Sequence, residues 1–153
     1  MNFEITKAIK GEKVDFKNPN MAFYEALGHD GMQKMMYDFY DKIYESDIAN
    51  FFPQDEEEFE EVKKKNTKFF IQICGGPSIY DESMQGVDLN KYMIDIHKNF
   101  SIYEKSRNEW LGTFREVLQD IDVDEKLKND FWDYLDKFSK MTVNRYPKES
   151  TYF

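Results

Sequence analysis

Apolar residues recur along most of this chain at the spacing of one helix face. They follow the i, i+3, i+4, i+7 pattern, which places side chains on one stripe of a helix with 3.6 residues per turn. No segment shows the strict alternation of a half-buried strand. The sequence therefore predicts an all-α protein, with helices over residues 30–46, about 57–73, 89–97, 110 to about 119, and about 125 to a point before Pro147.

Two kinds of break divide these helices. Pro53 lacks the amide proton that a helix needs, and Gly75 and Gly76 supply a flexible stop before Pro77. Residues 1–22 show no sustained period and read as a loose or surface-wrapping extension. At 153 residues the chain suits a single domain. We predict that this domain covers 23–146, between the extension and a tail over 147–153.

Composition narrows the classes of function. The formal net charge of -9 repels phosphate backbones and anionic lipids, so we expect neither nucleic acid nor a membrane as partner. A single cysteine, Cys74, excludes an internal disulfide, and two histidines are too few for an ordinary structural zinc site. No apolar run reaches the ~20 residues of a membrane helix. These features predict a cytoplasmic protein whose partner is small.

His97 shares the apolar stripe of its short helix with Leu89, Tyr92, Met93 and Ile96. An inward-facing histidine can be a core residue with a hydrogen-bond partner, or it can be a metal ligand. A single imidazole is sufficient to ligate haem iron, because the porphyrin brings its own four nitrogens. The scarcity of histidine therefore favours haem over zinc.

Asn66 is a polar residue on a helix face otherwise filled by phenylalanines. Leaving its amide unpaired in a core would cost about 1 to 3 kcal/mol, so it needs a partner. The partner can be a backbone carbonyl, a water or an iron-bound diatomic ligand. In the last case, the phenol of Tyr40 and the indole N–H of Trp110 would hold the ligand with it.

Several of these residues together resemble one family, the truncated haemoglobins, and within it the second group of two-on-two helical globins. The spacing of thirteen residues from His97 to Trp110 is the most specific part. The resemblance covers about 23–141. It is carried by Phe23–Gly28, Phe39-Tyr40, Phe51-Phe52-Pro53, Gln72, Gly75-Gly76-Pro77, Tyr80, Gly86, His97, Phe100, Ile102, Arg107 and Trp110-Leu111.

The resemblance implies a truncated-globin sandwich that binds haem b, iron protoporphyrin IX. His97 would be the proximal iron ligand, with Tyr40, Asn66 and Trp110 on the distal side. Arg107, or a lysine such as Lys91 or Lys98, would meet a haem propionate. The residues expected to line or pack against the haem are Phe52, Val62, Phe69, Met93, Phe100, Ile102 and Arg107.

The same resemblance implies the ligands O2, NO and CO, and a role in oxygen or nitric oxide chemistry or in redox protection. We expect ferrous haem to bind O2 with slow release, because distal donors stabilise the partly anionic ligand. Nitric oxide dioxygenase or peroxidase-like activity would need an external reductant, such as a reductase. The expected assembly is a monomer or a homodimer.

One other interpretation remains open, and the residues argue against two more. The chain can be a haem-free helical sensor or scaffold, in which His97 and Asn66 are core residues; a Soret band from the purified protein would exclude this. A carboxylate-bridged di-iron bundle needs Glu-x-x-His pairs, and neither histidine has a glutamate three residues before it. A phosphohydrolase built on His29-Asp30 would need further histidines.

Overall fold

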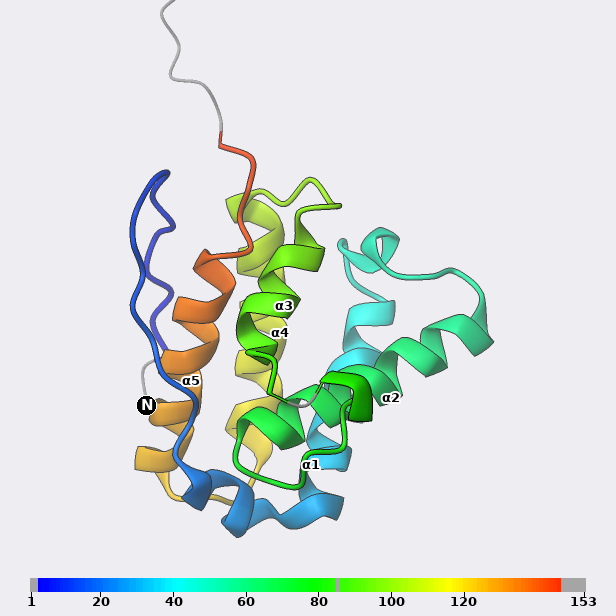
Figure 1. Ribbon diagram of the computed structural model, residues 1–153, viewed down its shortest axis with the longest axis vertical. Coiled ribbons are helices and arrows are strands. Elements are labelled where there is room, and N and C mark those ends of the chain that lie inside the picture. Colours follow the sequence, from blue (N-terminus) through cyan, green and yellow to red (C-terminus); the bar gives the residue numbers. More distant parts are fainter. Residues whose placement is uncertain (1–2, 85, 147–153) are drawn as a thin grey trace, which may run out of the picture.

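The part of the chain that the computed structural model describes contains five α-helices. Figure 1 shows their arrangement. The structure describes residues 3–84 and 86–146, which contain no strand, so the predicted all-α class is confirmed. The predicted tail, 147–153, lies outside the described residues. The helices are α1 (Met21–Tyr44), α2 (Glu56–Ile73), α3 (Leu89–His97), α4 (Glu104–Asp120) and α5 (Glu125–Lys140), with 3-10 turns η1 (Ala49–Phe51) and η2 (Glu82–Met84).

Four of the helices begin at a polar side chain that caps them. The first backbone N–H groups of a helix have no partner within it, and a side-chain oxygen at the N-cap satisfies one or two of them. Such a cap is worth about 0.5–2 kcal/mol. The capping side chains are Asn20 for α1, Asp55 for α2, Asp88 for α3 and Asp124 for α5.

Helix α1 is two helical segments joined at a kink. Gly28 has φ 71° and ψ 177°, a backbone conformation that is essentially restricted to glycine. The periodic pattern from residue 30 predicts only the second segment, and the family resemblance of Phe23–Gly28 predicts the first. Because α1 begins at Met21, residues 21 and 22 belong to this helix and not to the extension.

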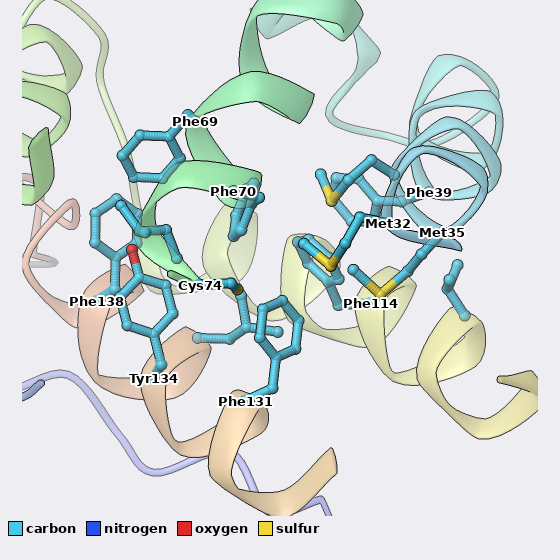
Figure 2. Packing of buried hydrophobic residues seen from close by; sticks show 14 of the residues in the cluster. Met32, Met35, Phe39, Phe69, Phe70, Cys74, Phe114, Phe131, Tyr134 and Phe138 are labelled. Atoms are coloured by element: carbon cyan, nitrogen blue, oxygen red, sulfur yellow. The ribbon is translucent and has the colours of Figure 1, made fainter. Parts of the chain in front are cut away.

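Aromatic rings fill the core between the helices (Figure 2). Helix α1 packs against α2 and α4, and α5 packs against α4 and α1, a two-on-two arrangement. Phe39 of α1 stacks on Phe114 of α4 with ring centroids 3.8 Å apart, and Phe23 stacks on Phe131 of α5 at 4.4 Å. Burial of each such ring stabilises the fold by about 1.5–3 kcal/mol.

The Gly75-Gly76 pair ends α2 where α1 comes very close. A Cβ added to Gly76 would lie 2.9 Å from Cε1 of Tyr24 in α1 and 2.8 Å from Cγ2 of Ile71 in α2. Only glycine fits at this position without a shift of its neighbours. The predicted stop after α2 is thus confirmed, and its reason is a close approach of two helices.

The N-terminal segment, residues 3–20, runs along α5 (Figure 1). The Trp132 indole N–H donates to the Glu4 carbonyl at 2.7 Å, and Arg115 donates to the Phe3 carbonyl at 2.8 Å. Phe3 and Ala8 are buried. The expected extension therefore wraps the surface, but it is fastened there by specific bonds. Among the described residues, no helix is sufficiently long and apolar to cross a membrane.

Candidate functional site

His97 is the last residue of α3, and its ring is fixed by the helix that carries it. Nδ1 lies 2.6 Å from the carbonyl oxygen of Met93, one turn earlier. Since a carbonyl only accepts, Nδ1 carries the proton and Nε2 keeps its lone pair. Burial lowers the pKa of His97, and this outweighs the Met93 carbonyl, which alone would raise the pKa. The ring is therefore held as a neutral imidazole with one nitrogen free to ligate.

His97 lies in the wall of a cavity between α3, α4, α5 and the η1 turn. The cavity holds ≈ 90 Å³ for the centres of water-sized molecules, within ≈ 520 Å³ of empty space that is partly open to solvent. Five predicted site residues meet in this wall: Phe52, His97, Ile102, Arg107 and Trp110. The other lining residues are Ile48, Phe51, Ser106, Phe138, Ser139 and Thr142.

Trp110 presents a hydrogen-bond donor on the α4 side of the cavity. Its indole packs edge-on against Phe39 and Phe114, with ring centroids 5.9 Å and 4.8 Å apart. No acceptor among the described residues is bonded to its N–H, whereas the indole of Trp132 has one. A buried or half-buried indole usually finds a partner. The Trp110 N–H is therefore available to a ligand.

Tyr40 and Asn66 form a pair behind Phe52. The Asn66 amide Nδ2 donates to the Tyr40 hydroxyl oxygen at 2.7 Å. Tyr40 is therefore the hydrogen-bond partner that Asn66 needs on its apolar helix face. The Tyr40 ring meets Phe52 edge-on at 5.9 Å, and Phe52 lines the cavity. Burial raises the pKa of Tyr40, although the Asn66 bond acts in the opposite direction. The phenol thus keeps its proton.

Six predicted site residues are not part of the cavity wall: Tyr40, Val62, Asn66, Phe69, Met93 and Phe100. Phe69 packs behind Phe138, which lines the cavity, with the two ring centroids 6.0 Å apart. Met93 is connected to the cavity wall by its backbone carbonyl, which is bonded to the His97 ring. Phe100 is 45% exposed and meets the ring of Phe51 edge-on at 6.3 Å. Val62 is half-buried on α2.

Arg107 is buried, and every N–H of its guanidinium has a protein acceptor. Nε donates to Ser139 Oγ at 2.8 Å; the other acceptors are the Thr6 carbonyl, Glu104 Oε1, and the carbonyl and Oδ1 of Asp136. Since a guanidinium has five N–H groups, none is left over. A propionate contact from Arg107 would have to replace one of these bonds.

The sequence analysis did not name six of the lining residues as site residues: Ile48, Phe51, Ser106, Phe138, Ser139 and Thr142. Ser106 lies one turn before Trp110 on the same helix, so the i, i+4 rule could have found it. Ser139 and Thr142 are polar positions at the end of α5 and give no apolar signal. Their place in the wall depends on how α5 packs.

The described residues contain no group of three or more His, Cys, Asp or Glu arranged to hold a metal ion. The zinc and di-iron interpretations therefore lack a ligand set in this part of the chain. His29 lies exposed on α1. A metal at His97 would have to arrive with most of its other ligands.

Comparison with known proteins gives consistent matches. Residues 22–144 match the model of a family described as bacterial-like globin. The group 2 truncated hemoglobin YjbI of Bacillus subtilis is 22% identical over 123 residues, which are 80% of this chain and 88% of that protein.

Solved structures agree in fold. Phosphate-bound Hell's gate globin IV has a TM-score of 0.75 and 26% identity, over 91% of this chain and 88% of that one. The group II truncated hemoglobin of Bacillus anthracis has a TM-score of 0.70 and 23% identity, over 80% and 95%. A truncated oxygen-avid haemoglobin from Bacillus subtilis has a TM-score of 0.68 and 20% identity, over 80% and 98%.

Proposed function

The chain belongs to the bacterial-like globin family and resembles its group II truncated haemoglobins, and on that premise we propose that it binds haem b and, through it, diatomic gases. The observation that carries the proposal is His97. Its imidazole is neutral, its Nδ1 is bonded to Met93, and the residue lines a cavity rich in aromatic side chains.

The residues of the cavity fit haem by the chemistry of their donors. One neutral imidazole is the proximal ligand of globins, and the hydrogen bond at its other nitrogen sets the ring's orientation and basicity. Phe52, Ile102 and Trp110 supply flat or apolar surface for a macrocycle. When bound, haem would supply an iron that takes up a diatomic gas.

The remaining predicted residues would support this site. Val62, Phe69, Met93 and Phe100 would pack against the macrocycle from α2, α3 and the segment after α3. Lys91 and Lys98 are exposed on either side of His97 and would meet a propionate, since Arg107 has all its N–H groups engaged.

Tyr40 and Trp110 would select the gas. Bound O2 carries partial negative charge, and an O–H or N–H donor directed at it stabilises that charge. Trp110 lines the cavity and its N–H has no acceptor among the described residues, whereas Tyr40 keeps its proton because burial raises its pKa. These donors would favour O2 over CO. The name of the compared Bacillus subtilis protein, oxygen-avid, is in keeping with this expectation.

Two uses of such a site follow. Slow release of O2 would suit storage or sensing. Conversion of O2 and NO into nitrate would consume reducing equivalents, so an external reductase would be a required partner.

Reconstitution with hemin tests the proposal. We expect a Soret band that saturates with one hemin per chain, and ferrous O2 and CO spectra of a histidine-ligated haem. His97→Ala should lose this axial signature and regain it with added imidazole. His29→Ala, which changes the chain's other histidine, on the exposed face of α1, should be unaffected. A colourless wild type would instead support the haem-free helical module.

A further inference from the structure

Asn144, in the segment that follows α5, is bonded to the stretch between His97 and α4. Its amide Nδ2 donates to the carbonyl of Phe100 at 2.7 Å and to that of His97 at 3.3 Å. Its Oδ1 accepts from the N–H of Ile102 at 2.9 Å. One side chain thus spans the stretch 97–102 from end to end.

Backbone hydrogen bonds of residues 144 and 145 also connect this segment to the stretch 97–102. The N–H groups of Asn144 and Arg145 both donate to the carbonyl of Ile102, each at 3.0 Å. Nε of Arg145 also donates to Ser101 Oγ at 3.3 Å. The stretch 97–102 is therefore fixed by residues that lie more than forty positions later in the chain.

These bonds act at the point where α3 ends. The last carbonyls of a helix have no partner within it and need one from elsewhere. The His97 carbonyl receives the N–H of Phe100 and the amide of Asn144. Because α3 has nine residues, its last turn carries the His97 ring and depends on such outside support.

The same contacts join two parts of the cavity wall. Ile102 and Thr142 both line the cavity, and Thr142 is followed two positions later by Asn144. A displacement of the 97–102 stretch would therefore move His97 and Ile102 together relative to α5.

We propose that Asn144 is a positioning residue for the ligating histidine: it ends α3 at His97, fixes the stretch 97–102 to the end of α5, and so sets the direction of the imidazole. This inference rests on the proposed function, because the direction of the imidazole matters only if His97 ligates haem. The effect of Asn144 on the position of His97 can be tested without haem.

Three variants separate the bonds. Asn144→Ala removes both donors and the acceptor, and Asn144→Asp keeps the acceptor for Ile102 while removing the donors to His97 and Phe100. Asn99→Ala is the matched control, because Asn99 is an exposed asparagine in the same stretch whose side chain has no bond to another described residue.

Amide exchange and histidine NMR of the full chain without hemin give the first readout. Asn144→Ala should speed exchange of the Ile102 amide about fivefold to tenfold, the effect of one lost hydrogen bond, and shift the ring signals of His97. Asn144→Asp should shift the His97 ring while leaving Ile102 protected. Asn99→Ala should change neither. Unchanged His97 signals in Asn144→Ala would overturn the proposal.

Resonance Raman spectra of the hemin-loaded, reduced chain give the second readout. The iron–histidine stretching band should shift in Asn144→Ala and Asn144→Asp and stay in place in Asn99→Ala. If haem binds and the band does not move, the positioning role is wrong. If no haem binds while the His97 ring still shifts in the free chain, the proposed function fails and the role of Asn144 in fixing His97 stands.

Discussion

The amide of Asn66 donates to the phenol oxygen of Tyr40 across 2.7 Å, which ties α2 to α1. The direction of this bond decides its chemical effect. Since the oxygen of Tyr40 is the acceptor, its own proton is not used by Asn66, and no other described residue accepts it. Asn66 therefore orients a phenol whose O–H remains available as a donor.

Tyr40→Phe should release O2 faster from the hemin-reconstituted, reduced protein. Loss of one good donor to a partly charged oxygen is worth about 1.5 to 3 kcal/mol, or roughly ten- to a hundredfold in the dissociation rate. Stopped-flow mixing checks this. Dissociation of CO, which carries little charge, serves as the control and should change much less. Equal O2 rates in both proteins would contradict a role for this phenol.

Asn66→Leu tests whether the asparagine acts through Tyr40 or touches the ligand itself. The single variant should also speed O2 release, by a smaller factor, because the phenol loses its orienting bond. In a Tyr40→Phe background the same change should have almost no further effect, as expected for residues coupled in one network. If the two effects simply add on a free-energy scale, Asn66 is an independent donor.

The stability of the haem-free chain should fall as the pH falls through the ordinary histidine range. Burial lowers the pKa of His97, so the unfolded chain takes up a proton more readily than the folded one. This loss begins near the unfolded pKa, about 6.5, and continues down to the folded pKa, with a slope of at most about 1.4 kcal/mol per pH unit.

Urea unfolding at about pH 7.5 and about pH 5.5, on either side of that value, measures the effect. His97→Gln should reduce the difference between the two free energies of unfolding. His29→Gln should leave it as in the wild type, because His29 is exposed. A wild-type difference that His97→Gln does not reduce would show that other groups cause it.

Asp136→Asn should destabilise the fold strongly. Asp136 Oδ1 accepts from Arg107 at 2.6 Å and from the Thr6 N–H at 3.0 Å, and Oδ2 accepts from Thr6 Oγ1 at 2.6 Å. Removing one charge from a buried ion pair costs about 3–5 kcal/mol when the partner is left without compensation. Glu104 still pairs with Arg107 at 2.6 Å, so we expect a loss near the lower end of this range.

Asp133→Asn is the matched control for this change. Asp133 lies on the same helix and pairs with Lys137 in solvent, where an ion pair contributes little. Chemical denaturation of both variants separates the two cases. A loss in Asp136→Asn no larger than that in Asp133→Asn would show that the buried pair is not important for stability.

Local pattern predicts where the helices lie, because it is a local property, but the predicted start of α4 at Trp110 is wrong. This helix begins at Glu104, since its first six residues are all polar and carry no apolar stripe. The apolar stripe and the cap at Asp55 determine α2, which runs from Glu56 to Ile73 against a prediction of about 57–73. The start of α1 was placed too late by periodicity, since its first segment is short and the kink at Gly28 interrupts the stripe.

The part of the candidate site that could be predicted consists of residues at a short, characteristic spacing along the chain. His97 and Trp110, thirteen residues apart, line one cavity. Arg107 shows the limit of prediction from sequence spacing. It was expected to face a propionate, yet its partners include Thr6, 101 positions away, and Asp136, 29 positions away. Asn144 gave no signal either, because its bond to His97 spans 47 positions. Tertiary packing brings such partners together, and a local sequence pattern does not predict tertiary packing.

The bond from Thr6 to Asp136 joins the N-terminal segment to α5, 130 positions later. During synthesis the N-terminal segment emerges long before its binding surface on α5. Contacts so distant in sequence slow folding, since a long loop must close before they form. The segment will therefore dock late, after the helices have assembled, and a nascent chain that stops before α5 will leave Phe3 exposed to water.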